Sequence, residues 1–353
     1  MGTHPEARTS PGRRAGLGVL VLAVLAVGVA LADVGWGAVL RELRTADHAL
    51  VLAALAASLL AQVAWAGVTA TTLRAVVPDA PRGRVRLGYL TGTFAKQVLP
   101  FGHAGGVPLL AYVLAEDLDA DYRTVFASVT ASELLVFLGS ATVAAVGGAL
   151  YLLTGPLPWR TASVALGIAG AATALVGAAG HRALRASVLT RGALLAAGVG
   201  RLTLGRLVPR TRAALEPEAV TVAVANFVAV FRRATDDRRR LARSAALALV
   251  GWVLFAAPLF LAFRAVGGDL PLALALVLVP AAGLAGLLPT PGGLGGAEVG
   301  TAGAAVLLTG ANVELAAAAV LLHRVATYWF VVAVGGAASL YLSVGAFDLR
   351  PGA

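Results

Sequence analysis

The sequence contains no cysteine, and Lys96 is the one lysine among its 28 basic residues. Without cysteine the chain forms no disulfide, offers no thiolate nucleophile and holds no zinc through sulfur. Charge is also scarce, because charged residues make up 13% of the chain whereas a soluble domain averages about 25%. A charge content this low excludes an ordinary soluble domain.

Enzyme motifs are missing as well. The sequence has no H-E-x-x-H zinc motif and no G-x-x-x-x-G-K-[ST] phosphate loop. The glycines at 292–296 fail the G-x-G-x-x-G pattern, because Glu298 stands where the third glycine belongs. We therefore expect that the protein is not an enzyme and that it needs no metal or other cofactor.

Apolar residues are what the chain has in abundance. They make up 59% of the 353 residues, and the mean hydropathy is +0.84. Several apolar runs reach the ~20 residues that cross the hydrocarbon core of a bilayer. These values predict an all-α fold, a polytopic transmembrane helical bundle. The net charge of +10 then indicates arginine-rich cytoplasmic loops, and we expect no nucleic-acid partner.

The distribution of arginine predicts the domains and the topology. We expect a disordered cytoplasmic tail over 1–16 and one transmembrane domain over 17–345 in the cell (inner or plasma) membrane. This domain divides into a first half (17–180), a cytoplasmic basic segment (181–243) and a second half (244–345). Leu17–Ala32 is predicted as a retained first helix, with cleavage as a signal peptide the open alternative.

Further spans follow from the apolar runs. A charge-balanced external loop over Asp33–Asp47 should precede a helix over Ala49–Leu73, and an arginine-rich cytoplasmic loop should follow it. The remaining predicted spans are Thr124–Leu153, Thr161–Gly180, Ser244–Phe263 and Val313–Leu342. A polar turn over 116–123 and an external Gly155–Trp159 turn separate some of them.

Two apolar stretches are interrupted by proline and glycine. Leu270–Leu308 contains A-G-L-L-P-T-P-G-G-L-G-G-A-E-V-G from Ala285, which cannot cross lipid as an unbroken helix. Leu87–Ala115 breaks at L-P-F-G-H-A-G-G, which begins at Leu99. Because free backbone groups at membrane depth need protein or a water-filled cavity around them, we expect two re-entrant hairpins. The first would enter from the cytoplasm and the second from outside, as in an inverted repeat.

Charged residues within the apolar sequence are the candidate functional groups. Lys96 would either bind an anionic headgroup or extend its ammonium to the interface. Glu298 and Arg324 are predicted to form a buried pair, either structural or in contact with substrate. Glu133 has the same alternatives and is also a partner for Lys96. His103 and His323 are expected to be hydrogen-bonded core or interface residues, since no metal-ligand spacing surrounds them.

The basic segment 181–243 holds thirteen arginines and four acids. Val220–Phe231 has helical apolar spacing and runs into R-R-A-T-D-D-R-R-R-L-A-R. This pattern favours a solvated cytoplasmic helix that contacts anionic headgroups, with a regulatory or partner site as the alternative.

Two motifs resemble a known family. L-L-P-T-P-G-G-L-G-G-A-E from Leu287, followed by a helix with H-R-V-A-T-Y-W, is similar to the signature of the lysylphosphatidylglycerol synthase transmembrane-region family. F-A-K-Q-V-L-P-F-G-H-A-G-G from Phe94 resembles the other half-motif of these flippase-like proteins, which are related to the flippase half of the multiple peptide resistance factor. The resemblance spans about Leu17 to Leu342.

The resemblance implies a helical bundle with two re-entrant hairpins that moves a lipid headgroup between leaflets. It implies that the path is lined or shaped by residues of the two motifs and the helices after them. The predicted substrate-binding set is Lys96, Gln97, Pro100, Gly105, Gly106, Glu133, Pro291, Gly292, Gly293, Gly295, Glu298, Arg324 and Tyr328.

The predicted function is therefore a lipid translocase for an anionic or amphipathic headgroup. The alternative is a non-transporting membrane partner that presents a polyprenyl-phosphate-linked sugar or lipid to a separate glycosyltransferase. The expected partners are membrane lipids, either phospholipid or polyprenyl-phosphate lipid, and anionic headgroups at 181–243. A homodimer is a further possible partner. Gly292, Gly296 and Gly300 recur at the spacing that lets helices pack closely.

Overall fold

The computed structural model describes residues 35–99, 102–154, 216–283 and 290–348, together with residues 190, 191, 194, 195 and 198. Every regular element in the four long ranges is a helix, which confirms the predicted all-α class. Several predicted segments lie outside the described residues: the tail over 1–16, the helix Leu17–Ala32, the turn Gly155–Trp159 and the span Thr161–Gly180.

Four helical stretches within the described residues are long and apolar enough to cross a membrane. They are α3 (His48–Leu73), α6 (Tyr122–Thr154), α11 (Arg238–Ala265) and the stretch Val313–Leu342. The last is made of α14 (Val313–Arg324), a π-helical turn, η3 (Val325–Trp329), and most of α15 (Phe330–Asp348). Large apolar side chains on their outer faces are exposed, as contact with lipid requires: Leu52, Leu60, Phe137, Val146 and Val250.

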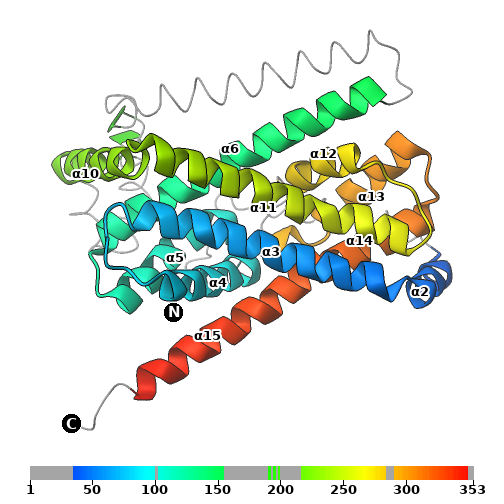
Figure 1. The fold of residues 1–353 in the computed structure, drawn as a ribbon, viewed down its shortest axis with the longest axis horizontal. Helices are drawn as coiled ribbons and strands as arrows, with labels where there is room; N and C mark the ends of the chain where they lie inside the picture. Colours follow the sequence, from blue (N-terminus) through cyan, green and yellow to red (C-terminus); the bar gives the residue numbers. More distant parts are fainter. Residues whose placement is uncertain are drawn as a thin grey trace, which may run out of the picture.

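Helices α3 and α11 lie side by side in opposite directions (Figure 1). At one end the backbone N–H of Asp47 donates to the carbonyl of Ala265 at 2.9 Å. Further along, Gly251 faces Trp65 so closely that a Cβ there would lie 2.3 Å from the indole nitrogen. A glycine is therefore what allows these two long helices to pack at this depth.

The first interrupted stretch forms a helical hairpin of α4 (Arg82–Val98) and α5 (Gly102–Leu118). Three contacts show that the helices are antiparallel. Gly88 faces Leu114, Gly92 faces Leu110, and Gly106 faces Lys96, so that each turn up α4 is matched by one turn down α5. The break was predicted over 99–106, but α4 ends at Val98 and α5 already begins at Gly102, so Gly102–Gly106 is helical. Helix α5 also includes Glu116 and Asp117 of the predicted polar turn.

The second interrupted stretch is divided into α12 (Leu272–Ala282), a 3-10 turn, η2 (Pro291–Gly293), and α13 (Gly296–Thr309). Gly292, Gly293 and Gly295 have positive φ angles of 57°, 68° and 87°. Side chains other than glycine rarely adopt this backbone conformation, so the glycines are what lets the chain turn here. The predicted break is confirmed, whereas re-entry into a membrane and an inverted repeat stay predictions.

Two other segments differ from the prediction. Trp36–Thr45, expected as part of a loop, is a short helix, α2, whose Val39 is buried and whose Leu43 packs on the core. Trp36, Val39, Leu40 and Leu43 have the i, i+3, i+4, i+7 spacing of an amphipathic helix, which the loop prediction from balanced charge did not use. The arginine run after Val220–Phe231 is divided between two helices, because Arg232 and Arg233 belong to α10 (Pro217–Thr235) whereas the arginines from Arg238 on belong to α11.

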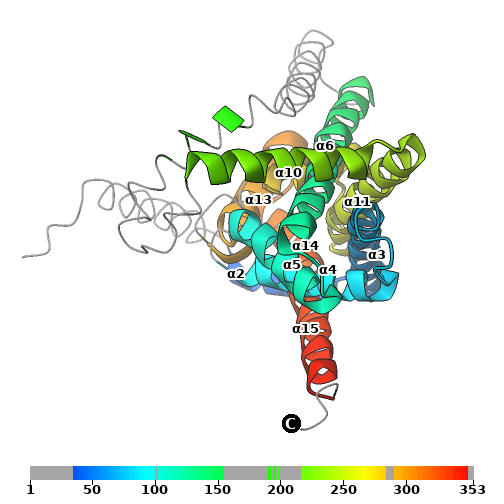
Figure 2. The same ribbon diagram turned by 90° about the vertical axis from the view of Figure 1, so that its left-hand side faces the viewer.

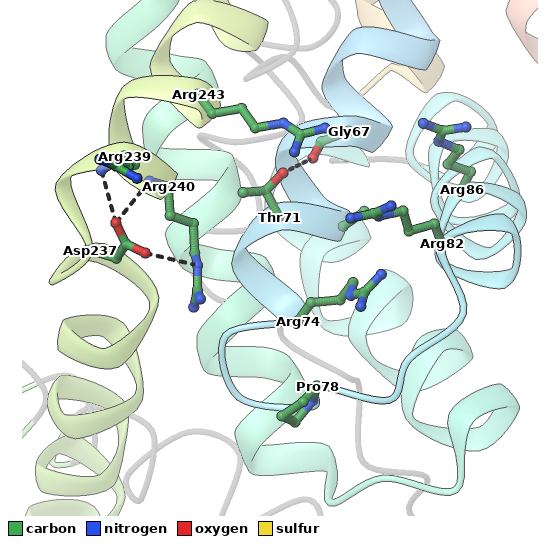
Figure 3. Close-up of a pocket in the computed structure, with 11 residues that line it drawn as sticks. Gly67, Thr71, Arg74, Pro78, Arg82, Arg86, Asp237, Arg239, Arg240 and Arg243 are labelled. Atoms are coloured by element: carbon green, nitrogen blue, oxygen red, sulfur yellow. Dashed lines mark hydrogen bonds and ion pairs between the residues drawn. The ribbon is translucent and has the colours of Figure 1, made fainter.

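Asp237 is the N-cap of α11, and its carboxylate accepts the backbone N–H groups of Arg239 and Arg240 at 2.9 and 3.3 Å. Helix α11 thus begins at Arg238. Its first turns and those of α4 bring their arginines to one end of the bundle, beside the end of α3 (Figure 3). Figure 2 shows α10 lying across this same end, where Phe231 packs against Ala131 of α6. We refer to it as the arginine-rich end.

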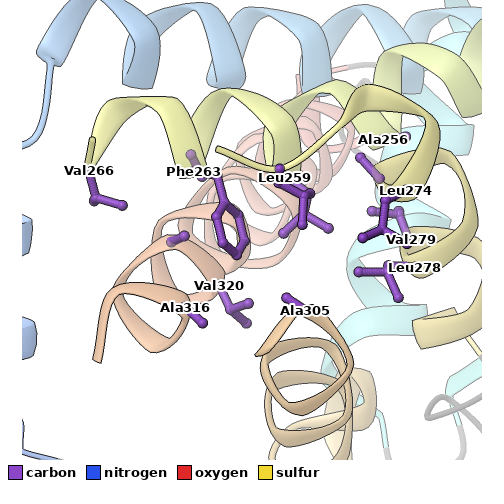
Figure 4. Packing of buried hydrophobic residues seen from close by; sticks show 14 of the residues in the cluster. Ala256, Leu259, Phe263, Val266, Leu274, Leu278, Val279, Ala305, Ala316 and Val320 are labelled. Atoms are coloured by element: carbon purple, nitrogen blue, oxygen red, sulfur yellow. The ribbon is translucent and has the colours of Figure 1, made fainter. Parts of the chain in front are cut away.

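Each half of the bundle has its own apolar core. One core joins α11, α12, α13 and α14 around Phe263, Leu259 and Leu274, with small side chains such as Ala305 and Ala316 between the helices (Figure 4). The other joins α3, α4, α5 and α6 around residues such as Leu110 and Leu114. Trp252 and Phe255 on α11 pack against both cores, and a polar cavity lies beside them.

Candidate functional site: an ion-paired cavity between the two helix breaks

Lys96 lies in the last turn of α4 and forms an ion pair and hydrogen bond with Glu133 of α6. The two side chains are 13% and 27% exposed, so the pair is largely withdrawn from the surface. The Lys96 ammonium also lies 5.9 Å from the centre of the Tyr89 ring. It follows that the ammonium points into the bundle, which favours the functional interpretation of Lys96 over extension to the interface.

A second ion pair joins α13 to α14. The Arg324 Nε donates to Glu298 Oε1 at 2.6 Å, and another guanidinium nitrogen donates to the carbonyl of Gly292 at 2.9 Å. The other carboxylate oxygen of Glu298 accepts the backbone N–H of Gly295 at 2.7 Å and so satisfies the N-terminus of α13. The predicted Glu298–Arg324 pair is present, and it also holds the glycine turn in place.

The two helix breaks meet. Gly292 in the second break lies against the Gln97 side chain, which stands next to the first break. The Tyr328 hydroxyl donates to the carbonyl of Gln97 at 3.3 Å, and the Arg324 guanidinium lies 4.7 Å from the centre of the Tyr328 ring. One cluster of contacts therefore connects both breaks to α14 and its π-helical turn.

The π-helical turn over Val325–Trp329 directly follows Arg324. A π-helix adds a residue to one turn and changes the direction of the side chains after it, and such turns are frequent at functional sites. Here the side chains of Arg324 and Tyr328 flank opposite parts of the same glycine turn at Gly292. The widened turn thus positions the aromatic ring and the guanidinium together.

These groups surround a cavity of about 260 Å³. Both ion pairs reach it, through Lys96, Glu133 and Arg324. Three further lining residues each have a buried polar atom that finds no hydrogen-bond partner among the described residues: Gln62 Oε1, Trp65 Nε1 and His323 Nδ1. Trp65 Nε1 packs against Gly251, whereas a partner for Gln62 or His323 would recover about 1–3 kcal/mol, which favours a polar ligand or water near these two side chains.

The predicted site residues fall into three groups. Those that line the cavity are Lys96, Gln97, Glu133, Gly292 and Arg324. Those that support it from behind are Gly106, Gly293, Gly295, Glu298 and Tyr328, among which Gly106 leaves room for the Lys96 side chain. Gly105 lies in α5 and Pro291 in η2, whereas Pro100 and the side chain of His103 lie outside the described residues.

Sequence analysis missed several lining residues. Gln62 and Trp65 come from α3, Tyr89 and Thr93 from α4, and Trp252 and Phe255 from α11. Gln62 was the one of these residues that the sequence could have indicated, because a polar amide within an apolar span costs free energy unless it forms hydrogen bonds. His323 is buried as expected, but among the described residues its Nδ1 has no partner for the hydrogen bond that we predicted.

Replacing Gly292 with alanine should destabilise the site. A Cβ at this position would lie 2.1 Å from a ring carbon of Tyr328, in a backbone conformation with φ of 57°. We expect a loss of at least about 2 kcal/mol in the free energy of unfolding, from the clash and the strain together. Thermal unfolding of the purified protein measures it, with Gly300→Ala, where a Cβ meets open space, as the control. Equal unfolding temperatures for the two variants would contradict the prediction.

Comparison with known proteins agrees with this architecture. The sequence profile described as the lysylphosphatidylglycerol synthase TM region matches residues 16–335. The chain belongs to this family. The match covers both breaks, both ion pairs and every helix that lines the cavity. Membership identifies an integral membrane protein and supports a lipid-related role.

Two curated relatives come from Methanothermobacter thermautotrophicus strain Delta H, and each is named "UPF0104 membrane protein". One is 25% identical over 92% of this chain and 94% of the relative. The other is 28% identical over 91% of this chain and 93% of the relative. The chain is thus similar to these family members along nearly its whole length.

Proposed function

We propose that the protein is a lipid translocase that moves an anionic or amphipathic headgroup between leaflets through the ion-paired cavity. The observation that carries the proposal is the meeting of two helix breaks around this cavity, with members of two ion pairs among the residues that line it. Broken helices that meet near the middle of a bundle are how transporters place a binding site at membrane depth.

The cavity offers the donors that an anionic headgroup needs. Lys96 donates one hydrogen bond to Glu133, and Arg324 donates one to Glu298 and one to Gly292, so each retains N–H groups for a ligand. A phosphate oxygen accepts such bonds well, and charged donors make the stronger ones. We therefore expect the phosphate of a phospholipid or polyprenyl-phosphate lipid to bind between the two cations.

The size of the cavity supports a headgroup and not a whole lipid. About 260 Å³ is just below the ~300–1,000 Å³ of sites that enclose a drug-sized ligand. The acyl chains would then remain in the bilayer, beside the exposed apolar faces of the long helices. This division is what allows a headgroup to cross while the tails stay in lipid.

In this proposal the α4–α5 hairpin enters the membrane from the arginine-rich end and the α12–α13 segment from the opposite end. The arginine-rich end would be cytoplasmic by the positive-inside rule, in the cell membrane. We propose transport and not catalysis, because both carboxylates at the site are held in ion pairs and neither is free to act as a general base.

The test is lipid flipping by the purified protein in proteoliposomes. We expect fluorescent phosphatidylglycerol in the inner leaflet to become accessible to dithionite faster than in protein-free vesicles, and Glu298→Ala to slow this exchange. Equal rates for the two proteins would remove the mechanism. If the wild type flips nothing and instead co-purifies with a glycosyltransferase, the protein is the non-transporting partner.

A further inference from the structure

A second pocket lies at the arginine-rich end, between the end of α3 and the beginnings of α4 and α11 (Figure 3). Its volume is about 380 Å³. The charged residues that line it are six arginines and one acid: Arg74, Arg82, Arg86, Arg239, Arg240, Arg243 and Asp237. Figure 3 shows Arg82 and Arg243 reaching from α4 and α11 toward Thr71 on α3. Three helices that are distant in sequence thus direct guanidinium groups into one space.

The positive charge of this pocket is not balanced by the protein around it. Asp237 is committed to the N-cap of α11 and to Arg240, whose Nε lies 3.9 Å away. Backbone hydrogen bonds from Arg240 and Arg239 lower the pKa of Asp237, so this carboxylate is ionised at neutral pH. None of the other five arginines forms an ion pair with any residue that the structure describes. The pocket therefore carries a net charge of +5, from six arginines less one aspartate.

The backbone adds to this charge. Helices α4 and α11 are 17 and 28 residues long, and both begin at the pocket. A helix N-terminus carries a partial positive charge, so two of them increase the attraction for an anion that the arginines already create. The volume far exceeds the ~10–15 Å³ that one water molecule needs. There is room for a group larger than a single small ion.

The pocket is separate from the ion-paired cavity. On α3 the cavity is lined by Gln62 and Trp65, and the pocket by Gly67, Ala70 and Thr71. Successive residues of a helix are about 100° apart, which places these two sets on nearly opposite faces of α3. The arginine pocket is therefore not the mouth of the cavity.

We propose that the arginine pocket is a binding site for a multiply charged phosphate, either a phosphomonoester or a pyrophosphate. Guanidinium groups bind phosphate oxygens in pairs, and several of them from different helices fit a group with three or more free oxygens. A charge of −2 or more neutralises much of the pocket, whereas a phosphodiester with one charge leaves most of it unbalanced. The ligand comes either from a lipid headgroup or from a soluble phosphate, and both present the same terminal group.

The experiment uses the full-length protein, purified in a neutral detergent. One arm titrates inorganic pyrophosphate at constant ionic strength, and the other titrates lipid nanodiscs that contain dioleoyl phosphatidic acid or, for comparison, dioleoyl phosphatidylglycerol. Binding is read from thermophoresis and from the rise in unfolding temperature that a ligand of the folded state produces. We expect saturable binding in at least one arm, with phosphatidic acid at least fivefold tighter than phosphatidylglycerol if the lipid is the source.

Matched variants decide whether the arginine pocket is responsible for the measured binding. Arg82→Gln with Arg243→Gln removes two exposed pocket arginines, and Arg84→Gln with Arg238→Gln removes the same charge from the same two helices outside the pocket. The pocket variant should bind at least tenfold more weakly, and the control within twofold of the wild type. Equal weakening in both variants, or no saturable binding to the wild type in either arm, would overturn the proposal. Because binding is measured without transport, the result does not depend on whether the protein flips lipid.

Discussion

Replacing Arg324 with methionine should lower the free energy of unfolding by about 3–5 kcal/mol. The substitution leaves the Glu298 carboxylate, whose side chain is 17% exposed, without its counter-charge inside the bundle. It also removes the donor to the carbonyl of Gly292, while methionine keeps most of the side-chain volume. Chemical unfolding of the purified protein in detergent micelles, followed by circular dichroism, measures the effect.

The chain offers a matched control for this prediction. Arg264 pairs with Asp269 at 3.6 Å near the opposite end of α11, but these side chains are 55% and 83% exposed. Exposed ion pairs contribute about 0–1 kcal/mol, so Arg264→Met should have little effect. The double variant Glu298→Gln with Arg324→Met should be more stable than Arg324→Met alone, because the unpaired charge is gone and the glutamine oxygen still accepts from Gly295. If Arg324→Met and Arg264→Met lowered the free energy of unfolding equally, burial would not strengthen the Glu298–Arg324 pair.

Replacing Lys96 with glutamine should slow lipid flipping at least tenfold. A hydrogen bond to a charged group contributes about 1.5–3 kcal/mol, and every 1.4 kcal/mol corresponds to a factor of ten. Lys96 lines the cavity beside Glu133, and its ammonium is one of the two cations that would hold the phosphate. The measurement is the initial rate of exchange of fluorescent phosphatidylglycerol in proteoliposomes reconstituted at equal protein density.

Two further variants separate transport from folding. Arg84→Gln removes a half-exposed cation from the same helix that does not line the cavity, and it should leave the rate unchanged. Lys96→Gln with Glu133→Gln removes both charges of the Lys96–Glu133 pair. This double variant should be more stable to unfolding than Lys96→Gln alone, and it should still flip lipid slowly. A double variant that flips at the wild-type rate would mean that the Lys96–Glu133 pair serves only the fold.

The helical spans were predictable because their signal is local. A run of about twenty apolar residues identifies a membrane helix whatever surrounds it, and α3, α6 and Val313–Leu342 begin and end within a few residues of the prediction. The breaks were predictable for a similar reason, since proline and clustered glycine disfavour a helix through their own backbones. Helix α2 was missed although its apolar residues have amphipathic spacing, because a ten-residue segment with balanced charge also fits a loop and is stabilised as a helix only by packing of Val39 and Leu43 on distant helices.

The candidate site was predictable in part. Lys96, Glu133, Glu298 and Arg324 are conspicuous as charges in apolar sequence, and the structure places all four within two ion pairs. Gln62, Trp65 and Trp252 were not identified, because a residue of α3 or α11 lines the cavity only through the way in which those helices cross. The π-helical turn after Arg324 was also missed, since no residue type requires it.

The sequence by itself determined that this protein is a bundle of membrane helices, where two of its apolar stretches are broken, and which charges stand within apolar sequence. Each of these follows from the solvation and backbone preferences of nearby residues. Only the tertiary structure decided that the two breaks touch, that the four charges pair as they do, and that arginines of α4 and α11 share one pocket. These features depend on contacts between helices far apart in the chain, which are set by packing at sites such as Gly251 against Trp65 and not by local sequence.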